Sequence, residues 1–211
     1  MSTPITPSRE AFAAAGLPVP LYTGKAPGRH DSNVWDARIG VLTHKVIGQV
    51  APMAQATTPT DYGALVRGIV AEVVKDRSLG RLDRARTRVT GLTIQYLREF
   101  LPPAGTTFLG SELAAGRGRV DLAWQHPTAG VWFDELKTWR HTQVGFDDAT
   151  WAQMTRYLDA GSTTYGGAFA GLRLLTLGNL RACVAVNRQG LVEDLADSPL
   201  HPSRLNEAVA A

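Results

Sequence analysis

The sequence predicts an α/β protein, because two kinds of apolar spacing follow one another along the chain. In the first half, apolar residues recur every three to four positions, as they do on one side of a helix. In the second half, short segments show the alternation typical of strands, and one helical stretch separates two groups of them. Helices and strands are therefore expected in the same domain.

Length and composition set the domain organisation. The 211 residues suffice for one domain with a substantial core. We expect this domain at 31–195, after an extended lead-in at 1–30 that is rich in proline and glycine, and before a tail at 196–211. The net charge of +3 is compatible with a polyanionic partner without requiring one.

Cysteine usage and hydropathy indicate a cytoplasmic protein. Cys183 is the only cysteine, which excludes an intrachain disulfide and fits a reducing compartment. No apolar run reaches membrane-spanning length, and the first twenty residues lack a basic segment followed by an apolar one. Neither a membrane partner nor a signal peptide is therefore expected.

Three helices are predicted before the first strand, each from one apolar stripe. The first begins near Asp31, and its stripe consists of Trp35, Ile39, Leu42, Val46 and Val50. The second runs from Pro59 to about Lys75, and its stripe consists of Leu65, Ile69 and Val73. The third runs from about Asp83 to Leu101, and its stripe consists of Val89, Leu92, Tyr96 and Phe100.

The rest of the chain is predicted to alternate between strands and helices. The expected strands are 106–113, 118–125, 131–139, 172–177 and 181–187. A helix is expected at about 147–160, and a short helix and tail at 194–211. The glycine-rich segment 161–171 is expected to be a mobile loop.

Two neighbouring strands carry the charged residues of greatest chemical interest. Asp121 lies in segment 118–124, and Glu135 and Lys137 lie in segment 131–137. Residues two apart on a strand point to the same face, and a hairpin can bring Asp121 beside them. Two nearby carboxylates can hold a hard cation such as Mg²⁺ or Mn²⁺, and an ammonium can support charge on a phosphate. This pattern is typical of a metal-dependent phosphodiesterase.

The alternative is that these residues are ordinary solvent-facing charges of a hairpin. Two observations favour a site. Glu135 and Lys137 interrupt an apolar row formed by Val131, Phe133 and Trp139, and burying unpaired charge is costly. Lys137 is also one of only four lysines against eighteen arginines, and the two cations are not interchangeable.

With two further motifs, these residues resemble the PD-(D/E)XK nuclease superfamily. Gly40-x-x-x-His44 resembles the motif that opens its RecB-like branch, and Gln153-x-x-x-Tyr157 resembles the motif on the helix after the catalytic strands. The order His, Asp, Glu-x-Lys, Gln-x-x-x-Tyr is the RecB-like order, and the resemblance spans about residues 34–158. One cysteine excludes the four-cysteine iron–sulfur cluster of some RecB-like nucleases.

The resemblance implies a central mixed β-sheet flanked by helices, as in restriction endonucleases. It implies that Asp121 and Glu135 ligate one or two Mg²⁺ or Mn²⁺ ions. His44, through a neutral ring nitrogen, and the backbone carbonyl of Leu136 are the further expected ligands. A histidine in an oxygen-rich shell shifts the preference somewhat toward Mn²⁺.

The remaining motif residues are expected to support the reaction. Lys137 orients or activates the attacking water and neutralises charge in the transition state. In the family, the residues matching Gln153 and Tyr157 order the active site or contact DNA. RecB-like nucleases often carry a glutamate where Glu112 stands, and the alternative for Glu112 is a plain strand carboxylate.

Arginines are expected to contact the phosphates of the nucleic acid. The start of the third helix is rich in arginine, although positive charge there opposes the helix dipole. The gain is either phosphate binding or simple solvation of that face. The expected nucleic-acid-binding residues are Arg84, Arg88, Arg119, Arg140 and Arg156.

The function expected from this resemblance is a metal-dependent DNA nuclease in repair, recombination, phage replication or phage defence. One alternative keeps the site and changes the substrate to RNA, or to specific structures cut by an endonuclease. Another is a non-catalytic subunit that binds nucleic acid. No P-loop motif is present, so any ATP-driven unwinding comes from a partner such as a helicase.

Overall fold

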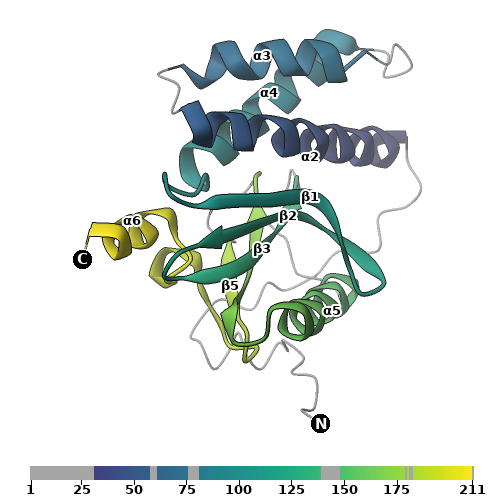
Figure 1. Cartoon of the computed structure of the whole chain (residues 1–211). Coiled ribbons are helices and arrows are strands. Elements are labelled where there is room, and N and C mark those ends of the chain that lie inside the picture. The colour runs from purple at the N-terminus through teal and green to yellow at the C-terminus, as the bar shows by residue number, and fades with distance from the viewer. Residues whose placement is uncertain are drawn as a thin grey trace.

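The structure, a computed structural model, describes residues 31–57, 61–75, 81–138, 148–178, 180 and 183–210. Within these ranges the chain forms an α/β fold with a six-stranded mixed sheet between two layers of helices (Figure 1). The expectation of a central mixed sheet flanked by helices is therefore confirmed.

The strands lie in the sheet in chain order. The first three are β1 (Thr107–Ala115), β2 (Gly118–His126) and β3 (Gly130–Lys137). The last three are β4 (Phe169–Thr176), β5 (Val184–Asn187) and β6 (Val192–Asp194). All neighbours pair antiparallel except β3 and β4, which are parallel. Helix α5 (Asp148–Tyr165) belongs to the connection between these two parallel strands, as parallel pairing requires a crossover.

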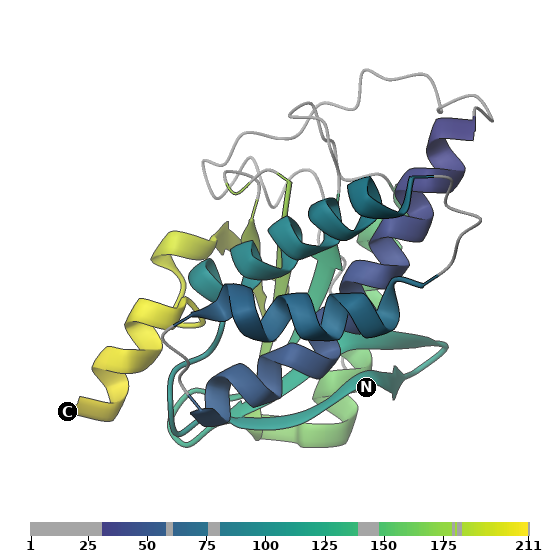
Figure 2. The same ribbon diagram turned by 90° about the horizontal axis from the view of Figure 1, so that it is seen from above.

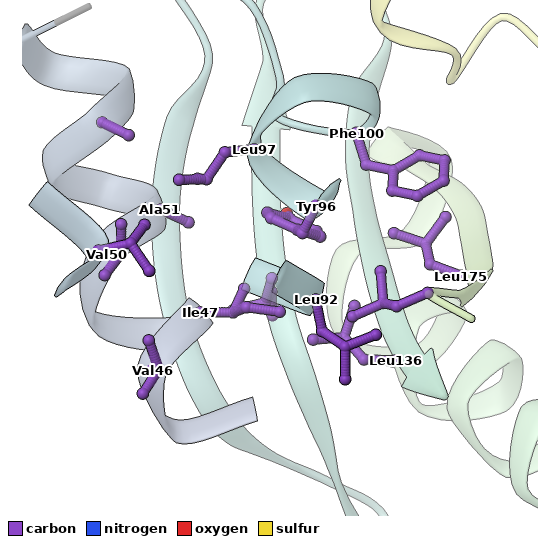
Figure 3. Packing of buried hydrophobic residues seen from close by; sticks show 14 of the residues in the cluster. Val46, Ile47, Val50, Ala51, Leu92, Tyr96, Leu97, Phe100, Leu136 and Leu175 are labelled. Carbon is purple, nitrogen blue, oxygen red and sulfur yellow. The ribbon is translucent and has the colours of Figure 1, made fainter. Parts of the chain in front are cut away.

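Three helices form the layer on one face of the sheet: α2 (Asp31–Thr57), α3 (Tyr62–Val73) and α4 (Leu82–Glu99). Seen from above, they cross the sheet on the side opposite to α5 (Figure 2). One apolar cluster joins α2 and α4 to the strands beneath them. Figure 3 shows part of this cluster and labels Val46, Ile47, Val50, Ala51, Leu92, Tyr96, Leu97, Phe100, Leu136 and Leu175.

A second apolar cluster lies on the opposite face, between the sheet and α5. From α5 it includes Trp151, Met154 and Leu158, which recur at helical spacing. Gly161 lets the helix approach the sheet, because a Cβ there would come within 2.2 Å of the Phe169 ring. This layer fixes the position of α5 over β3 and β4.

The helical stripes of the sequence are confirmed for α2 and α4. The predicted stripe residues of α4 are all buried, and those of α2 are buried or packed against the core. The predicted stripe of α3 also packs against this core, but it is not the most deeply buried face of that helix. Val66 and Val70 are fully buried, whereas Leu65, Ile69 and Val73 are only partly buried.

The expected mobile loop at 161–171 is also wrong. Helix α5 continues to Tyr165, a 3-10 turn covers Gly166–Ala168, and β4 begins at Phe169. The contact of Gly161 with the sheet explains why a small residue stands inside the helix. The sequence also did not predict β6 or the 3-10 turn Leu195–Asp197, whereas the C-terminal helix was expected and is α6 (Pro202–Ala210).

A buried ion pair joins the sheet to the helical layer. Asp134 of β3 and Arg173 of β4 are register partners, and both side chains are 0% exposed. The Arg173 guanidinium donates two hydrogen bonds of 2.7 Å to the Asp134 carboxylate. Asp134 also accepts from Tyr96 Oη (3.0 Å) and Trp124 Nε1 (3.1 Å). Arg173 donates further to the carbonyls of Phe100 and Leu200, so this charge is fully enclosed by partners.

None of the helices in the described ranges combines the length and apolar character that crossing a bilayer demands.

Candidate functional site

The candidate site lies where β2 and β3 stop pairing. Their register runs from His126–Gly130 to Leu122–Asp134 and no further. Asp121 lies within β2, directly before the paired residue Leu122. Its Oδ2 accepts a 2.7 Å hydrogen bond from the backbone N–H of Leu136. The carboxylate thus satisfies a strand N–H that the diverging partner leaves open. Asp121 is held by the backbone of the strand that carries the other charged residues.

Helix α2 brings His44 to the same point. Its Nδ1 lies 2.9 Å from Oδ1 of Asp121. Burial acts to lower the pKa of His44, but the hydrogen bond to Asp121 and the negative charge of that group outweigh it, so the pKa is raised. Gly40, one turn earlier, lets α2 pass close to the end of β3, because a Cβ there would lie 3.1 Å from Thr138 Oγ1.

Glu135 and Lys137 form a close pair on the α5 side of β3. Lys137 Nζ lies 2.7 Å from Glu135 Oε1, and the Glu135 side chain is only 5% exposed. Oε2 of Glu135 is buried and has no hydrogen-bond partner among the described residues. Burial, and next the charge of Asp121, raise the pKa of Glu135 to about 7. One oxygen of this carboxylate is therefore available to a ligand.

Helix α5 completes the arrangement through an amide and a phenol. Lys137 Nζ donates to Gln153 Oε1 at 3.1 Å, and Gln153 Nε2 donates to Tyr157 Oη at 2.9 Å. Tyr157 donates in turn to the carbonyl of Arg119. The ring packs on Gly118, where a Cβ would lie 2.9 Å from Tyr157 Cε1. This chain of contacts fixes the direction of the Lys137 ammonium.

The six motif residues therefore lie in one neighbourhood, although they come from four separate elements. The contacts join His44 to Asp121 and Lys137 to both Glu135 and Gln153. Gln153 is joined in turn to Tyr157. Asp121 and Glu135 are close enough for the charge of one to raise the pKa of the other. The result is a buried cluster of carboxylates with an imidazole and an ammonium at its edges.

The donor types suit a hard divalent cation, and the free Oε2 of Glu135 is the oxygen best placed to accept one. In the arrangement described, His44 bonds to Asp121 instead, and no three histidine, cysteine or acidic side chains of the described residues converge as a ligand set. A cation bound by Nδ1 of His44 would have to replace the contact of this atom with Asp121. Leu136 contributes its N–H, which the sequence did not indicate.

The backbone of Glu112 lies beside Asp121 in the sheet, but the Glu112 side chain does not contact the site residues. Ser111 pairs with Leu122 and Leu113 with Val120, so Glu112 lies across from Asp121. Its φ of 52° is in the left-handed region, and its side chain is exposed. No hydrogen bond or ion pair joins it to the site residues within the described part of the chain. The expected additional acid has no visible partner there.

The expected nucleic-acid-binding arginines do not form one patch. Arg84 and Arg88 line a groove on α4 next to Trp35, with the Arg84 guanidinium 5.4 Å from the centre of the Trp35 ring. Arg119 and Arg156 are exposed beside Tyr157. Arg140 lies outside the described residues, as does Trp139 of the predicted apolar row.

Two supporting residues were not found from the sequence. Gly118 gives room to Tyr157, and Arg117, at the β1–β2 turn, lines a groove beside α5. The sequence did contain a signal for Gly118. A glycine at the start of a strand marks a close approach of another element, and this strand also carries a candidate carboxylate.

Comparison with protein-family models gives no match for this chain, and comparison with curated proteins gives no significant match either.

Proposed function

We propose that this chain is a divalent-metal-dependent nuclease that hydrolyses phosphodiester bonds in DNA. The observation that supports this most is the buried Glu135–Lys137–Gln153 cluster beside Asp121, in which one carboxylate oxygen has no protein partner. A buried, unsatisfied carboxylate oxygen is costly unless a proton or a cation occupies it. A functional role for this oxygen is the simplest reason why the protein tolerates the cost of its burial.

Asp121 and Glu135 are the residues that would hold the cation, with His44 as a nitrogen ligand. When bound, a divalent cation polarises a phosphodiester and lowers the pKa of a coordinated water. The Leu136 N–H keeps Asp121 oriented toward the cluster. The closeness of the two carboxylates disfavours their joint ionisation without a cation, which suits a site that gains stability on binding one.

Lys137 supplies the positive charge that a phosphate needs in the transition state. Its Nζ is held by Glu135 and Gln153 and is mostly buried, so it loses little freedom when substrate arrives. Gln153 must present its oxygen to the ammonium, and Tyr157 enforces this by accepting from the amide nitrogen. Gln153 and Tyr157 therefore position Lys137 in this proposal.

The test is cleavage of end-labelled linear and closed circular DNA by purified protein with Mn²⁺, Mg²⁺ or EDTA. We expect metal-dependent degradation, lost by at least about 100-fold in Lys137→Ala, since removing one such charge-stabilising group has effects of this size. Lys75→Ala is the matched control, because Lys75 is an exposed lysine paired with Glu72. Sparing of the circle would indicate an exonuclease.

Three outcomes would contradict the proposal. Equal cleavage by wild type and Lys137→Ala would point to a contaminating nuclease. Failure to cut DNA under any condition, with cleavage of labelled RNA in a parallel assay, would move the substrate to RNA. Binding of nucleic acid without cleavage of either would favour the non-catalytic subunit.

A further inference from the structure

A groove of about 590 Å³ lies between the β1–β2 turn and helix α5. The turn contributes Gly116 and Arg117, and α5 contributes Arg156, Asp159 and Thr163. The α5 residues are three or four positions apart, so they lie along one face of the helix. This groove is separate from the contacts that hold the carboxylate cluster.

Among the described residues, the charges in this groove do not cancel. The side chains of Arg117 and Arg156 are exposed, and neither guanidinium has an ion pair or hydrogen bond within the described part of the chain. Asp159 lines the same groove and is likewise without an ion-pair partner there. Two unpaired guanidinium groups with one opposing carboxylate leave a positively charged groove open to an anion.

The groove is physically connected to the candidate site through Tyr157. Arg156 precedes Tyr157 on α5, and the Tyr157 hydroxyl bonds to the carbonyl of Arg119, two residues after Arg117. The ring also packs on Gly118. Arg156 lies three positions after Gln153, a rise of about 4.5 Å along the helix axis. A strand lying at Lys137 would therefore reach this groove within a few nucleotides.

We propose that this groove binds a backbone phosphate of the nucleic-acid strand, next to the phosphate that lies at Lys137. The inference rests on the proposed function, and Arg117 and Arg156 are the residues that would guide the strand. Guanidinium groups form paired hydrogen bonds with phosphate oxygens, and two unpaired ones facing one groove can share such an anion. Asp159 opposes the phosphate and limits how tightly it is held.

A binding assay tests the groove independently of cleavage. A fluorescent 20-nucleotide single strand and the matching duplex are titrated with wild-type protein in EDTA and again with Ca²⁺, at several salt concentrations. We expect Arg117→Ala and Arg156→Ala each to weaken binding about 5-fold to 10-fold and to reduce the salt slope by about one. Asp159→Asn is expected to tighten binding about 2-fold to 3-fold.

Arg204→Ala is the matched control, because Arg204 is an exposed arginine on α6 with its own partner, Glu207. It is expected to bind like wild type. In a cleavage assay, Arg117→Ala and Arg156→Ala are expected to raise KM with little change in kcat, as for groups that bind substrate away from the reacting atoms.

The outcomes distinguish the groove from the nuclease. Weaker binding by both arginine variants in a protein that does not cleave supports the groove and contradicts the proposed activity. If Arg117→Ala and Arg156→Ala cleave DNA with unchanged KM, and Asp159→Asn does not bind more tightly, the groove does not bind a phosphate. The proposed nuclease activity would then still stand. Absence of any nucleic-acid binding, with or without Ca²⁺, overturns the groove as well.

Discussion

Asp134 and Glu135 are consecutive carboxylates on β3, both buried, yet their surroundings are opposite. Asp134 faces the helical layer and accepts four hydrogen bonds, two of them from Arg173. Glu135 faces α5 and accepts one, from Lys137, while its other oxygen has no partner among the described residues. Alternation along the strand places the two groups on different faces of the sheet.

The difference teaches that burial alone does not identify a reactive carboxylate. A buried charge whose hydrogen-bonding capacity is filled is fixed in place and serves the fold. A buried charge with an unfilled oxygen has a raised pKa and can accept a proton or a cation. Saturation by partners, rather than exposure, separates the structural group from the candidate catalytic one.

The largest expected effect tests the structural half of this comparison. Asp134→Asn removes the charge that balances Arg173 without changing the size of the side chain. Breaking a buried pair from one side leaves an uncompensated charge, so we expect a loss of about 3 to 5 kcal/mol in the free energy of unfolding. Urea denaturation followed by circular dichroism measures it.

A double variant checks the cause. In Asp134→Leu with Arg173→Met no buried charge remains, so part of the lost stability should return relative to Asp134→Asn. A loss below about 1 kcal/mol in Asp134→Asn would show that the comparison with Glu135 is mistaken.

The next effect concerns the pH dependence that Glu135 creates. Its pKa is about 7 in the folded protein, against an ordinary value near 4.5, so between these pH values the folded state keeps a proton that the unfolded state loses. The contribution of Glu135 to stability in EDTA should therefore fall as pH rises from about 4.5 to 7, by about 3 kcal/mol in total, and then level off. The raised pKa of His44 contributes a decline of the same sign above pH 6.5.

Glu135→Gln keeps the shape of the side chain and cannot ionise. The variant should retain only the decline that His44 contributes, and it should be inactive as a nuclease. Thermal unfolding of the wild type and of Glu135→Gln from pH 4 to pH 8 measures how the stability of each depends on pH. Parallel stability curves for wild type and variant would contradict the assignment of a raised pKa to Glu135.

The smallest expected effect concerns the orientation of Lys137. Tyr157→Phe removes the hydroxyl that bonds to Gln153 and to the Arg119 carbonyl but keeps the ring on Gly118. We expect a loss of about 1 to 2 kcal/mol in unfolding free energy. If Lys137 supports the reaction, kcat should fall while KM changes little. Adding Gln153→Glu to Tyr157→Phe places beside Lys137 a carboxylate that accepts from the ammonium in either orientation, so part of kcat should return. No change of kcat in either the single or the double variant would remove Gln153 and Tyr157 from the proposal.

Much of the fold follows from local patterns in the sequence. The stripes of α2 and α4 are visible because one helix face contacts one core. The common face of Glu135 and Lys137 follows from strand alternation. The rotation of α3 was not visible, because its small and branched apolar residues surround most of the helix and only tertiary contacts select a face.

The role of Asp134 could not be read from its neighbours, because its partner lies 39 residues away on a strand joined by a crossover. A signal existed in β4, where Arg173 stands between leucines in a segment with strand character. A buried strand that contains an arginine requires an acidic partner. The sequence contains no signal that one oxygen of Glu135 lacks a partner among the described residues. Whether this oxygen is bonded depends on the positions of all the neighbouring elements.

The conformation of β1 has a consequence for solubility. β1 and the three-residue β6 are the two edges of the sheet, and an edge strand offers unpaired backbone groups to other chains. In β1 the register shifts between Phe108 and Gly110, and Gly110 and Glu112 both have positive φ. These irregularities and the exposed charge of Glu112 divide the longer edge into short pieces, so it is a poor template for edge-to-edge aggregation.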